Sequence, residues 1–176
     1  MMRMIGIVFF IFFYAHLYVH FIVNPNNECS ILQEITKEDI TNKVYEKLPF
    51  VFDATGMKNG TCSLIEPYVR FVSEQKIYTQ KKWTESRETC RTFYRVEQGC
   101  YEVSCIHPKY KDLVSHPKLL KQNTQIIRLT LHEKSILFVP NYWTVQFKAK
   151  TLGKVERITY KTPLNELSIS IGKIFE

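Results

Sequence analysis

Five cysteines and five histidines are the side chains in this sequence best suited to bind a metal or act as a nucleophile. Cys100 and Cys105 are not followed by the second close pair that a zinc knuckle needs. His132-Glu133 begins a zinc-protease motif, but Lys134-Ser135-Ile136 replaces its remaining residues. The sequence also lacks a glycine-rich phosphate loop and a Gly-x-Ser-x-Gly motif. No established catalytic motif therefore identifies the chain as an enzyme.

A long apolar segment precedes all of these cysteines. Met4–Val23 contains no Asp, Glu, Lys or Arg, and as a helix it would be roughly 30 Å long, about the thickness of a bilayer core. A cleaved signal peptide has a shorter apolar region and small residues at its cleavage site. Residues 24–28 offer no such site. We expect residues 1–23 to be an uncleaved transmembrane signal anchor and residues 24–176 to form one domain.

His16 and His20 lie four residues apart within this segment, on one face of the expected helix. Histidines inside a membrane can bind metals or relay protons. These two lie close to Tyr14 and Tyr18, where amphipathic side chains are expected near the lipid headgroups, so an interfacial role is favoured. Arg3 precedes the segment, and acids outnumber lysines just after it. This bias predicts a cytoplasmic N-terminus and a lumenal or exterior domain.

The composition is that of a folded domain with a basic surface. Apolar residues make up 45% of the chain and aromatic residues 14%, which is enough for a core. The formal net charge is +7, but the lysines are dispersed and the densest run is Lys81-Lys82. Nucleic-acid binding normally needs cations clustered on one face, so we expect no nucleic-acid partner. The odd number of cysteines cannot pair completely within one chain.

Two short helices are expected near the start of the domain. The first spans residues 36–48, begins with an acidic turn, and has an apolar residue at every fourth position. These apolar residues are Ile40, Val44 and Leu48. A short buried strand follows at Phe50–Phe52. The apolar spacing of Leu64–Val72 then predicts a second helix, with Pro67 in its first turn.

The remainder of the domain alternates apolar and polar residues with a period of two. Such alternation, interrupted by Gly and Pro, predicts several short strands that form a sandwich or barrel with the helices outside. The expected strands are Thr92–Val96, Tyr101–His107, Ile127–Leu131, Ser135–Val139, Trp143–Ala149, Val155–Lys161 and Leu167–Ile171.

The order of three segments, Arg91–Gly99, Val103–Pro108 and Ser135–Trp143, resembles the cupin/JmjC-type double-stranded β-helix. The chain most resembles the small, membrane-anchored, cupin-like proteins encoded by large DNA viruses, which also begin with an aromatic-rich apolar helix. Leu48-Pro-Phe-Val-Phe-Asp53 matches an early segment of those proteins, and the end of the third segment matches their Ile-Pro-x-Tyr-Trp-Trp signature. The resemblance implies a mainly β protein: a cupin or jelly-roll barrel with short flanking helices.

Active members of these families hold a metal with two closely spaced ligands and a distant histidine. The resemblance places Cys105 and His107 in the first pair, six and eight residues after Gly99, and Asp112 as an acidic ligand. The distant histidine is missing, because Trp143 is followed by Thr, Val and Gln. The resemblance therefore implies a vestigial site with no working metal and no cofactor, iron being the alternative.

These observations predict a single-pass membrane protein whose cupin-like barrel binds or scaffolds a protein partner at the membrane, without catalysis. Its binding surface would be the barrel mouth, with contributions from Arg95, Tyr142 and Trp143, although core packing is the more ordinary role for Trp143. Two alternatives stay open. One is an Fe(II)/2-oxoglutarate-type or other metal-dependent cupin oxygenase. The other is an unrelated secreted β-sandwich held by two disulfides, with one free cysteine.

Overall fold

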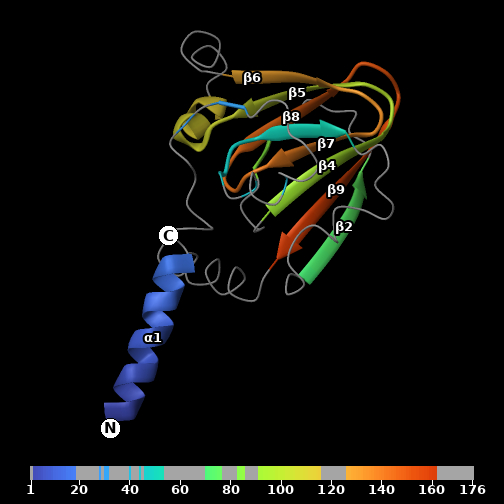
Figure 1. Cartoon of the computed structure of the whole chain (residues 1–176). Helices are drawn as coiled ribbons and strands as arrows, with labels where there is room; N and C mark the ends of the chain where they lie inside the picture. The colour runs from blue at the N-terminus through green and yellow to red at the C-terminus, as the bar shows by residue number, and fades with distance from the viewer. Residues whose placement is uncertain are drawn as a thin grey trace.

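The computed structural model describes residues 2–18, 28, 30–31, 40, 44, 46–53, 70–76, 83–85, 91–115 and 126–161. Figure 1 shows one helix standing apart from a body of β-strands. The elements, in chain order, are α1 (Met2–Tyr18), β1 (Phe50–Asp53), β2 (Arg70–Lys76), β3 (Trp83–Glu85), β4 (Arg91–Gln98), β5 (Tyr101–Ile106), the 3-10 helix η3 (Pro108–Ser115), β6 (Ile126–Leu131), β7 (Ser135–Val139), β8 (Thr144–Ala149) and β9 (Lys154–Lys161).

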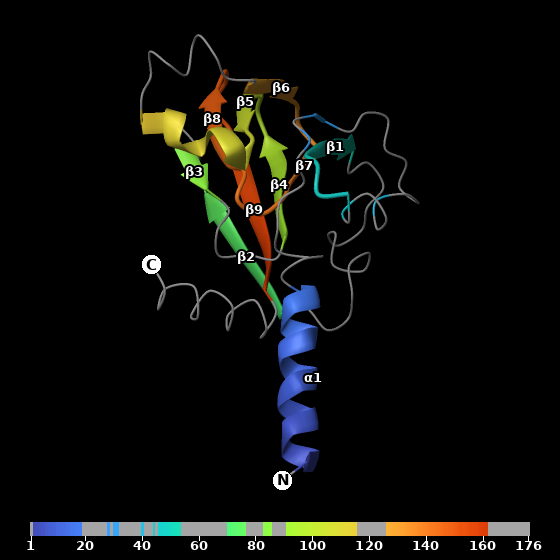
Figure 2. The same ribbon diagram turned by 90° about the vertical axis from the view of Figure 1, so that its left-hand side faces the viewer.

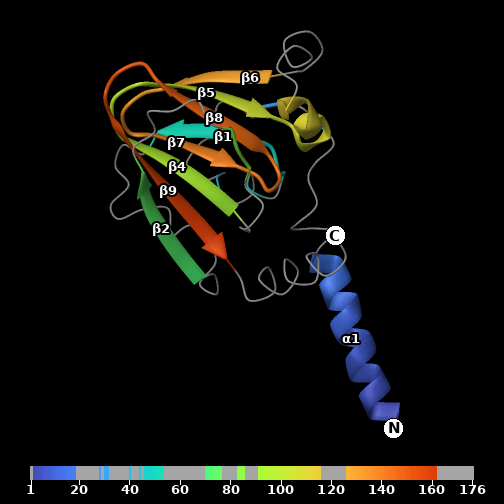
Figure 3. The same cartoon turned by 180° about the vertical axis from the view of Figure 1, so that it is seen from behind.

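The strands form one long antiparallel hairpin that is rolled up on itself. β2 pairs with β9, β3 with β8, β4 with β7 and β5 with β6. The roll produces two facing sheets, with the strand orders β1-β7-β4-β9-β2 and β3-β8-β5-β6 (Figure 3). Apart from the added strand β1, this order is that of a jelly roll, or double-stranded β-helix. The predicted mainly β class and the double-stranded β-helix are therefore confirmed.

The inner core lies between the two sheets and is built by side-chain alternation. In β5, Tyr101, Val103 and Cys105 point inward and are fully buried, whereas Glu102 and Ser104 point the other way and are half-buried. Each inward side chain meets partners from the neighbouring strands and from the opposite sheet. The buried members of this cluster are Tyr94, Val96, Tyr101, Val103, Cys105, Leu131, Leu137, Val139, Trp143, Val145, Phe147 and Val155.

A second apolar cluster covers the outer face of the five-stranded sheet. Phe93 and Phe138 lie opposite each other in register, and their ring centroids are 5.0 Å apart. Ile40 and Val44 are described as helical, are buried and belong to this cluster. At these two positions the prediction of a helix packed on the outside of the barrel is confirmed.

One end of the barrel is closed by two loops whose backbones touch. Gly99, between β4 and β5, has a φ of +91°. A Cβ atom on Gly153, between β8 and β9, would lie 2.2 Å from the carbonyl oxygen of Gln98. The hydroxyl of Thr151 accepts a hydrogen bond from the amide of Cys100 at 2.9 Å. Glycine is needed at both positions because a side chain has no room there.

Helix α1 projects away from the sheets in all three views, and its N-terminus is the far end (Figure 2). Its large apolar side chains from Met4 to Tyr14 are 49–71% exposed. Phe9 and Phe13, one turn apart, stack with their ring centroids 6.4 Å apart. Of the helices within the described residues, none combines the length and the apolarity needed to cross a membrane. The predicted anchor extends to residue 23, beyond the described helix, and stays a prediction.

Three other expectations need correction or lie outside the described residues. The helix predicted over Leu64–Val72 is wrong from Arg70 onward, because those residues pair with β9 as strand β2. Strand β3 was not expected, because three residues are too few to show a period. The strand predicted at Leu167–Ile171 lies outside the described part of the chain.

The cysteines correct the secreted-sandwich alternative, which needs two disulfides. Cys100 and Cys105 are free, so the three remaining cysteines suffice for only one disulfide.

Candidate functional site

His107 lies at the end of β5, where it was expected, and is only 4% exposed. Ile106 pairs with Thr144, which places His107 beside Trp143 at the start of β8. The two rings meet edge to face, with centroids 5.1 Å apart. The imidazole Nδ1 accepts a hydrogen bond from the backbone amide of Lys109 at 3.1 Å. His107 therefore fixes the turn from β5 into η3 and packs against the inner core.

Cys105 lies two residues earlier on the same strand, inside the barrel. Its neighbours in register are Ile127 on β6 and Val145 on β8, and its side chain is fully buried. Burial raises the pKa of the Cys105 thiol from 9.0 to about 12. The thiol therefore stays protonated at neutral pH, whereas metal ligation and nucleophilic attack both require the thiolate.

Asp112 lies on η3 and is exposed, in contrast to Cys105 and His107. Among the described residues, no group of three His, Cys, Asp or Glu side chains is placed to hold a metal ion. In β8, Val145 points into the core at one of the positions where the sequence lacks the expected histidine. The Cys105 thiol is protonated in apolar surroundings, and the Asp112 carboxylate is exposed. These two groups therefore do not fit an iron site with His107. The structure thus brings Cys105 and His107 to one end of the barrel without assembling a ligand set.

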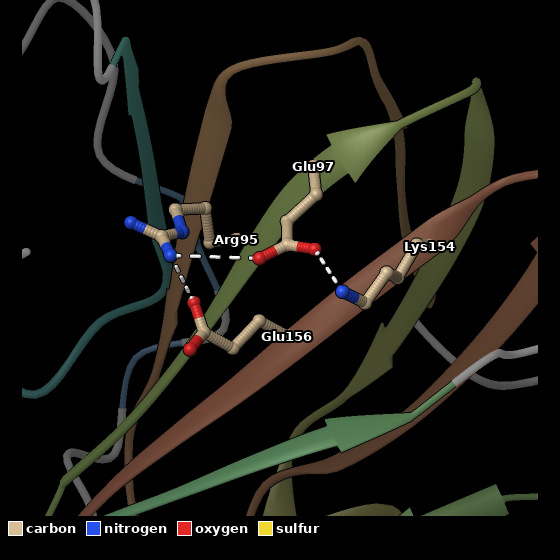
Figure 4. Close-up of polar contacts among 4 residues, drawn as sticks. All are labelled: Arg95, Glu97, Lys154 and Glu156. Carbon is tan, nitrogen blue, oxygen red and sulfur yellow. Dashed lines mark ion pairs between the residues drawn. The ribbon is translucent and has the colours of Figure 1, made fainter.

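Arg95 lies on the outer face of the five-stranded sheet. It follows Tyr94, whose side chain belongs to the inner core, so alternation turns the guanidinium outward. Arg95 forms an ion pair with Glu156 on β9 and a longer one with Glu97, at 3.6 Å (Figure 4). Lys154 contacts the other oxygen of Glu97 at 2.7 Å. These four residues, which we call the outer ion-pair row, satisfy the charge of Arg95 within the protein.

Tyr142 and Trp143 occupy the turn between β7 and β8. Trp143 is fully buried and belongs to the inner core, so core packing is its main role. Tyr142 is half-buried and has a φ of +65°, in the left-handed region. The structure does not gather the three proposed mouth residues, because Arg95 and Trp143 lie on opposite faces of the barrel wall. Ligand binding by any of them stays a prediction.

Arg157 on β9 is a candidate that the sequence analysis missed. Val155 belongs to the inner core and Ile158 to the outer cluster, so alternation turns Arg157 inward. It is half-buried, and its Nε atom is enclosed without a hydrogen-bond partner in the described part of the structure. The sequence Val-Glu-Arg-Ile-Thr gave no usable signal, because charged and apolar residues occur on both alternating sets.

No family model matches the chain, and no curated protein matches it. Several solved structures resemble part of it. The Drosophila melanogaster CENP-C cupin domain shares 8% identity at a TM-score of 0.36, over 52% of this chain and 56% of that one. Streptomyces albus HEPD, solved with 2-hydroxyethylphosphonate and Fe(II), shares 7% identity at a TM-score of 0.40, over 60% and 21% of the two chains.

Hydroquinone 1,2-dioxygenase from Sphingomonas sp. TTNP3, solved with 4-hydroxybenzoate, shares 13% identity at a TM-score of 0.37, over 56% of this chain and 63% of that one. The match covers less than two thirds of each of these three structures. Likenesses at these scores say nothing about what this chain binds. The fold assignment rests on its strand order instead.

Proposed function

We propose that this chain is a membrane-tethered barrel that acts by binding a partner at the membrane and not by metal catalysis. The observation that best supports the membrane tether is the exposure of the apolar side chains of α1. Phe9 and Phe12 are each 71% exposed, and every large apolar residue from Met4 to Tyr14 is at least 49% exposed. Contiguous apolar surface of this kind is unfavourable in water and marks a membrane or protein contact.

The proposed span is the uncharged sequence Met4–Val23, and residues 4–18 of it lie in the described helix α1. The placement of Arg3 before the span favours a cytoplasmic N-terminus and a lumenal or exterior barrel. The ordered likeness of several segments to membrane-anchored, cupin-like proteins of large DNA viruses supports the same arrangement.

Binding without metal chemistry is supported by the state of the two inward-facing residues that the resemblance named. The Cys105 thiol is held protonated in the core, and His107 is engaged by Trp143 and the Lys109 amide. No observation on the described residues favours the oxygenase alternative. The partner we propose is a protein at the same membrane and not a nucleic acid, because the lysines are dispersed along the sequence.

Alkaline carbonate extraction of membranes from cells expressing the full chain tests the tether. We expect the wild-type chain to stay in the pellet, and the double variant Phe9→Lys, Phe12→Lys to be released. Leu152→Lys is the matched control, because Leu152 is 86% exposed but lies in the loop before β9, and this variant should stay in the pellet. Release of the wild-type chain would overturn the tether.

Two further measurements test the absence of metal catalysis and the presence of a partner. Elemental analysis after purification with added Fe(II) should find iron far below one atom per chain, and near-stoichiometric iron would refute this part of the proposal. Affinity capture from crosslinked membranes should recover a protein partner reproducibly with the wild-type chain. Repeated capture that recovers no partner would count against the binding role.

A further inference from the structure

A row of side chains crosses the outer face of the four-stranded sheet. Ser104 on β5 is in register with Arg128 on β6 and with Gln146 on β8. Gln146 is in turn in register with Trp83 on β3. The residues before and after Ser104 and Gln146 in their strands belong to the inner core, so these two side chains point outward. Residues directly opposite each other project to the same side of a sheet, so all four residues, which we call the outer polar row, share this face.

The outer polar row is open to solvent and is closed off only at the end next to η3. Arg128 is exposed, and the other three residues of the row are half-buried. Toward η3, the outward-facing Ile106 and Thr144 are 0% and 6% exposed. There Lys111 of η3 pairs with Glu85 of β3 at 3.5 Å, which holds η3 beside that strand (Figure 2).

Trp83 is not explained by core packing. It belongs to neither of the two buried apolar clusters, and it is not one of the partly buried residues that pack against the inner core. Its register partner is the polar side chain of Gln146. An indole combines a large apolar body with a polar N–H group, a combination that suits an amphipathic ligand.

The positive charge of this face is concentrated at its β6 edge. Lys148, on the central strand β8, pairs with Glu102 at 3.6 Å. Arg128 and Lys150 are exposed, and none of the ion pairs between described residues includes either of them. The Nζ atom of Lys150 donates a hydrogen bond to the hydroxyl of Thr130 on β6 at 3.5 Å. The face thus presents an aromatic residue on β3, neutral hydrogen-bonding groups on the middle strands and two cations along β6.

We infer that the outer polar row binds an acidic oligosaccharide. The apolar face of one sugar ring packs against Trp83. Hydroxyls of the following rings form hydrogen bonds with the amide of Gln146 and the hydroxyl of Ser104. A carboxylate or sulfate group on the sugar accepts hydrogen bonds from the guanidinium of Arg128. Neighbouring strands are about 4.8 Å apart, so the row extends over about 14 Å, enough for roughly three sugar residues.

Other occupants of this face fit the row less well. An extended acidic peptide would bind along the edge of a sheet and not across its strands. A nucleic acid would need a longer series of cations. A face that meets only water is common in antiparallel sheets, but it has no need of an indole at its margin. The inference rests on the proposed binding function and names the ligand, so that the proposed protein partner carries a glycan. It does not depend on the membrane tether.

An array of immobilised oligosaccharides, probed with the epitope-tagged full chain in detergent micelles, tests the inference. The array holds sialylated, uronic-acid-containing and sulfated chains, each beside a neutral chain of equal length. We expect acidic chains of about three or more sugars to be bound at least about tenfold more tightly than their neutral counterparts, because each charged hydrogen bond adds affinity. The arm of the array that is bound identifies the acidic group as carboxylate or sulfate.

Titration of the most tightly bound chain against variants locates the site. Arg128→Gln and Trp83→Ala should each raise Kd by about tenfold or more, because each removes one end of the row. Trp83→Phe should retain most of the affinity, because it keeps an aromatic ring. Lys134→Gln is the matched control for charge, since Lys134 is exposed in the turn before β7, away from the row, and its Kd should stay that of wild type.

Three results overturn the site: no bound oligosaccharide, equal binding of the neutral counterparts, or an unchanged Kd in Trp83→Ala. An equal loss in Arg128→Gln and Lys134→Gln also overturns it, because binding would then follow net charge alone. If Trp83→Ala does not fold, Gln146→Ala takes its place, and an unchanged Kd in that variant counts against the row in the same way. Affinity capture is a separate measurement, so a protein partner recovered despite an empty array would leave the proposed function standing without this site.

Discussion

The imidazole of His107 meets the indole of Trp143 edge to face, with ring centroids 5.1 Å apart and ring planes at 79°. Both residues are buried at the end of the barrel where β5 stops and β8 begins. Aromatic pairs in this arrangement are favourable beyond the area they bury. In the sequence His107 has the position of a metal ligand, and in the structure it is a packing residue that orients the entry to η3.

Trp143 should be among the most important single side chains for stability. Trp143→Ala removes a fully buried indole, and we expect it to lower the free energy of unfolding by about 3–5 kcal/mol. Trp83→Ala, in the half-buried edge strand β3, should cause less than half of that loss. Urea unfolding of the full chain in micelles, followed by far-UV circular dichroism, measures both. A smaller loss for Trp143→Ala than for Trp83→Ala would refute the packing role.

Burial of Cys105 predicts a specific dependence of stability on alkaline pH. The pKa of the thiol is raised from 9.0 to about 12, so above pH 9 the unfolded chain loses a proton that the folded chain keeps. The free energy of unfolding should therefore fall as pH rises from 9 toward 12, by about 1.4 kcal/mol per pH unit from this group. Cys105→Ala lacks this contribution, so its stability should decline less steeply between pH 8 and 10.5. Parallel declines would contradict the shift.

The two described cysteines should differ in reactivity toward alkylation. Cys105 is fully buried and protonated at neutral pH, whereas Cys100 is half-exposed in the loop after β4. Alkylation depends on access and on thiolate, so iodoacetamide at pH 8 should modify Cys100 at least about tenfold faster. Peptide mass spectrometry over a time course gives both rates. In urea the two alkylation rates should become equal. Unequal rates in urea would show that the residues flanking each cysteine, and not burial in the fold, cause the difference.

The ion pairs of the outer ion-pair row should contribute unequally to stability. Glu156 is 7% exposed, so Arg95→Ala leaves an enclosed carboxylate without its main partner, and we expect a loss of about 1–3 kcal/mol. Lys154→Ala breaks a more exposed pair and should lose less than about 1 kcal/mol. Adding Glu156→Gln to Arg95→Ala should recover part of the first loss. A double-mutant cycle from urea unfolding measures the coupling, and a coupling near zero would show that the pair does not stabilise the fold.

The closed end of the barrel should not tolerate a side chain at Gly153. A Cβ atom there would lie 2.2 Å from the Gln98 carbonyl oxygen and 2.9 Å from the Tyr101 hydroxyl. We expect Gly153→Ala to lower the free energy of unfolding by about 1–3 kcal/mol through overpacking. Gly6→Ala in α1 is the control, because nothing lies within 4 Å of the added carbon, and it should not destabilise the barrel. A Gly153→Ala variant as stable as wild type would show that the two loops separate easily.

The alternation of residue types was enough to predict most of the strands. From Thr92 to Lys161, segments of period two bounded by Gly and Pro correspond to strands β4 to β9. The helix predicted from the spacing of Leu64–Val72 is wrong at its C-terminal end. The seven residue pairs that join β2 to β9 override the local helical pattern there. The sequence was also sufficient to show that a late histidine ligand is missing, since that conclusion needs residue identities alone.

The side of the sheet on which each charge lies was decided by the tertiary structure. Arg95 and Arg157 are both basic residues in strands of period two, and nothing local separates them. The antiparallel register of β4 and β9 turns Arg95 outward to Glu156 and turns Arg157 inward beside Tyr94. The sequence determined that the chain forms strands and begins with an apolar segment. Which residues face the barrel interior depends on pairings between segments about 60 residues apart, and no local pattern contains that information.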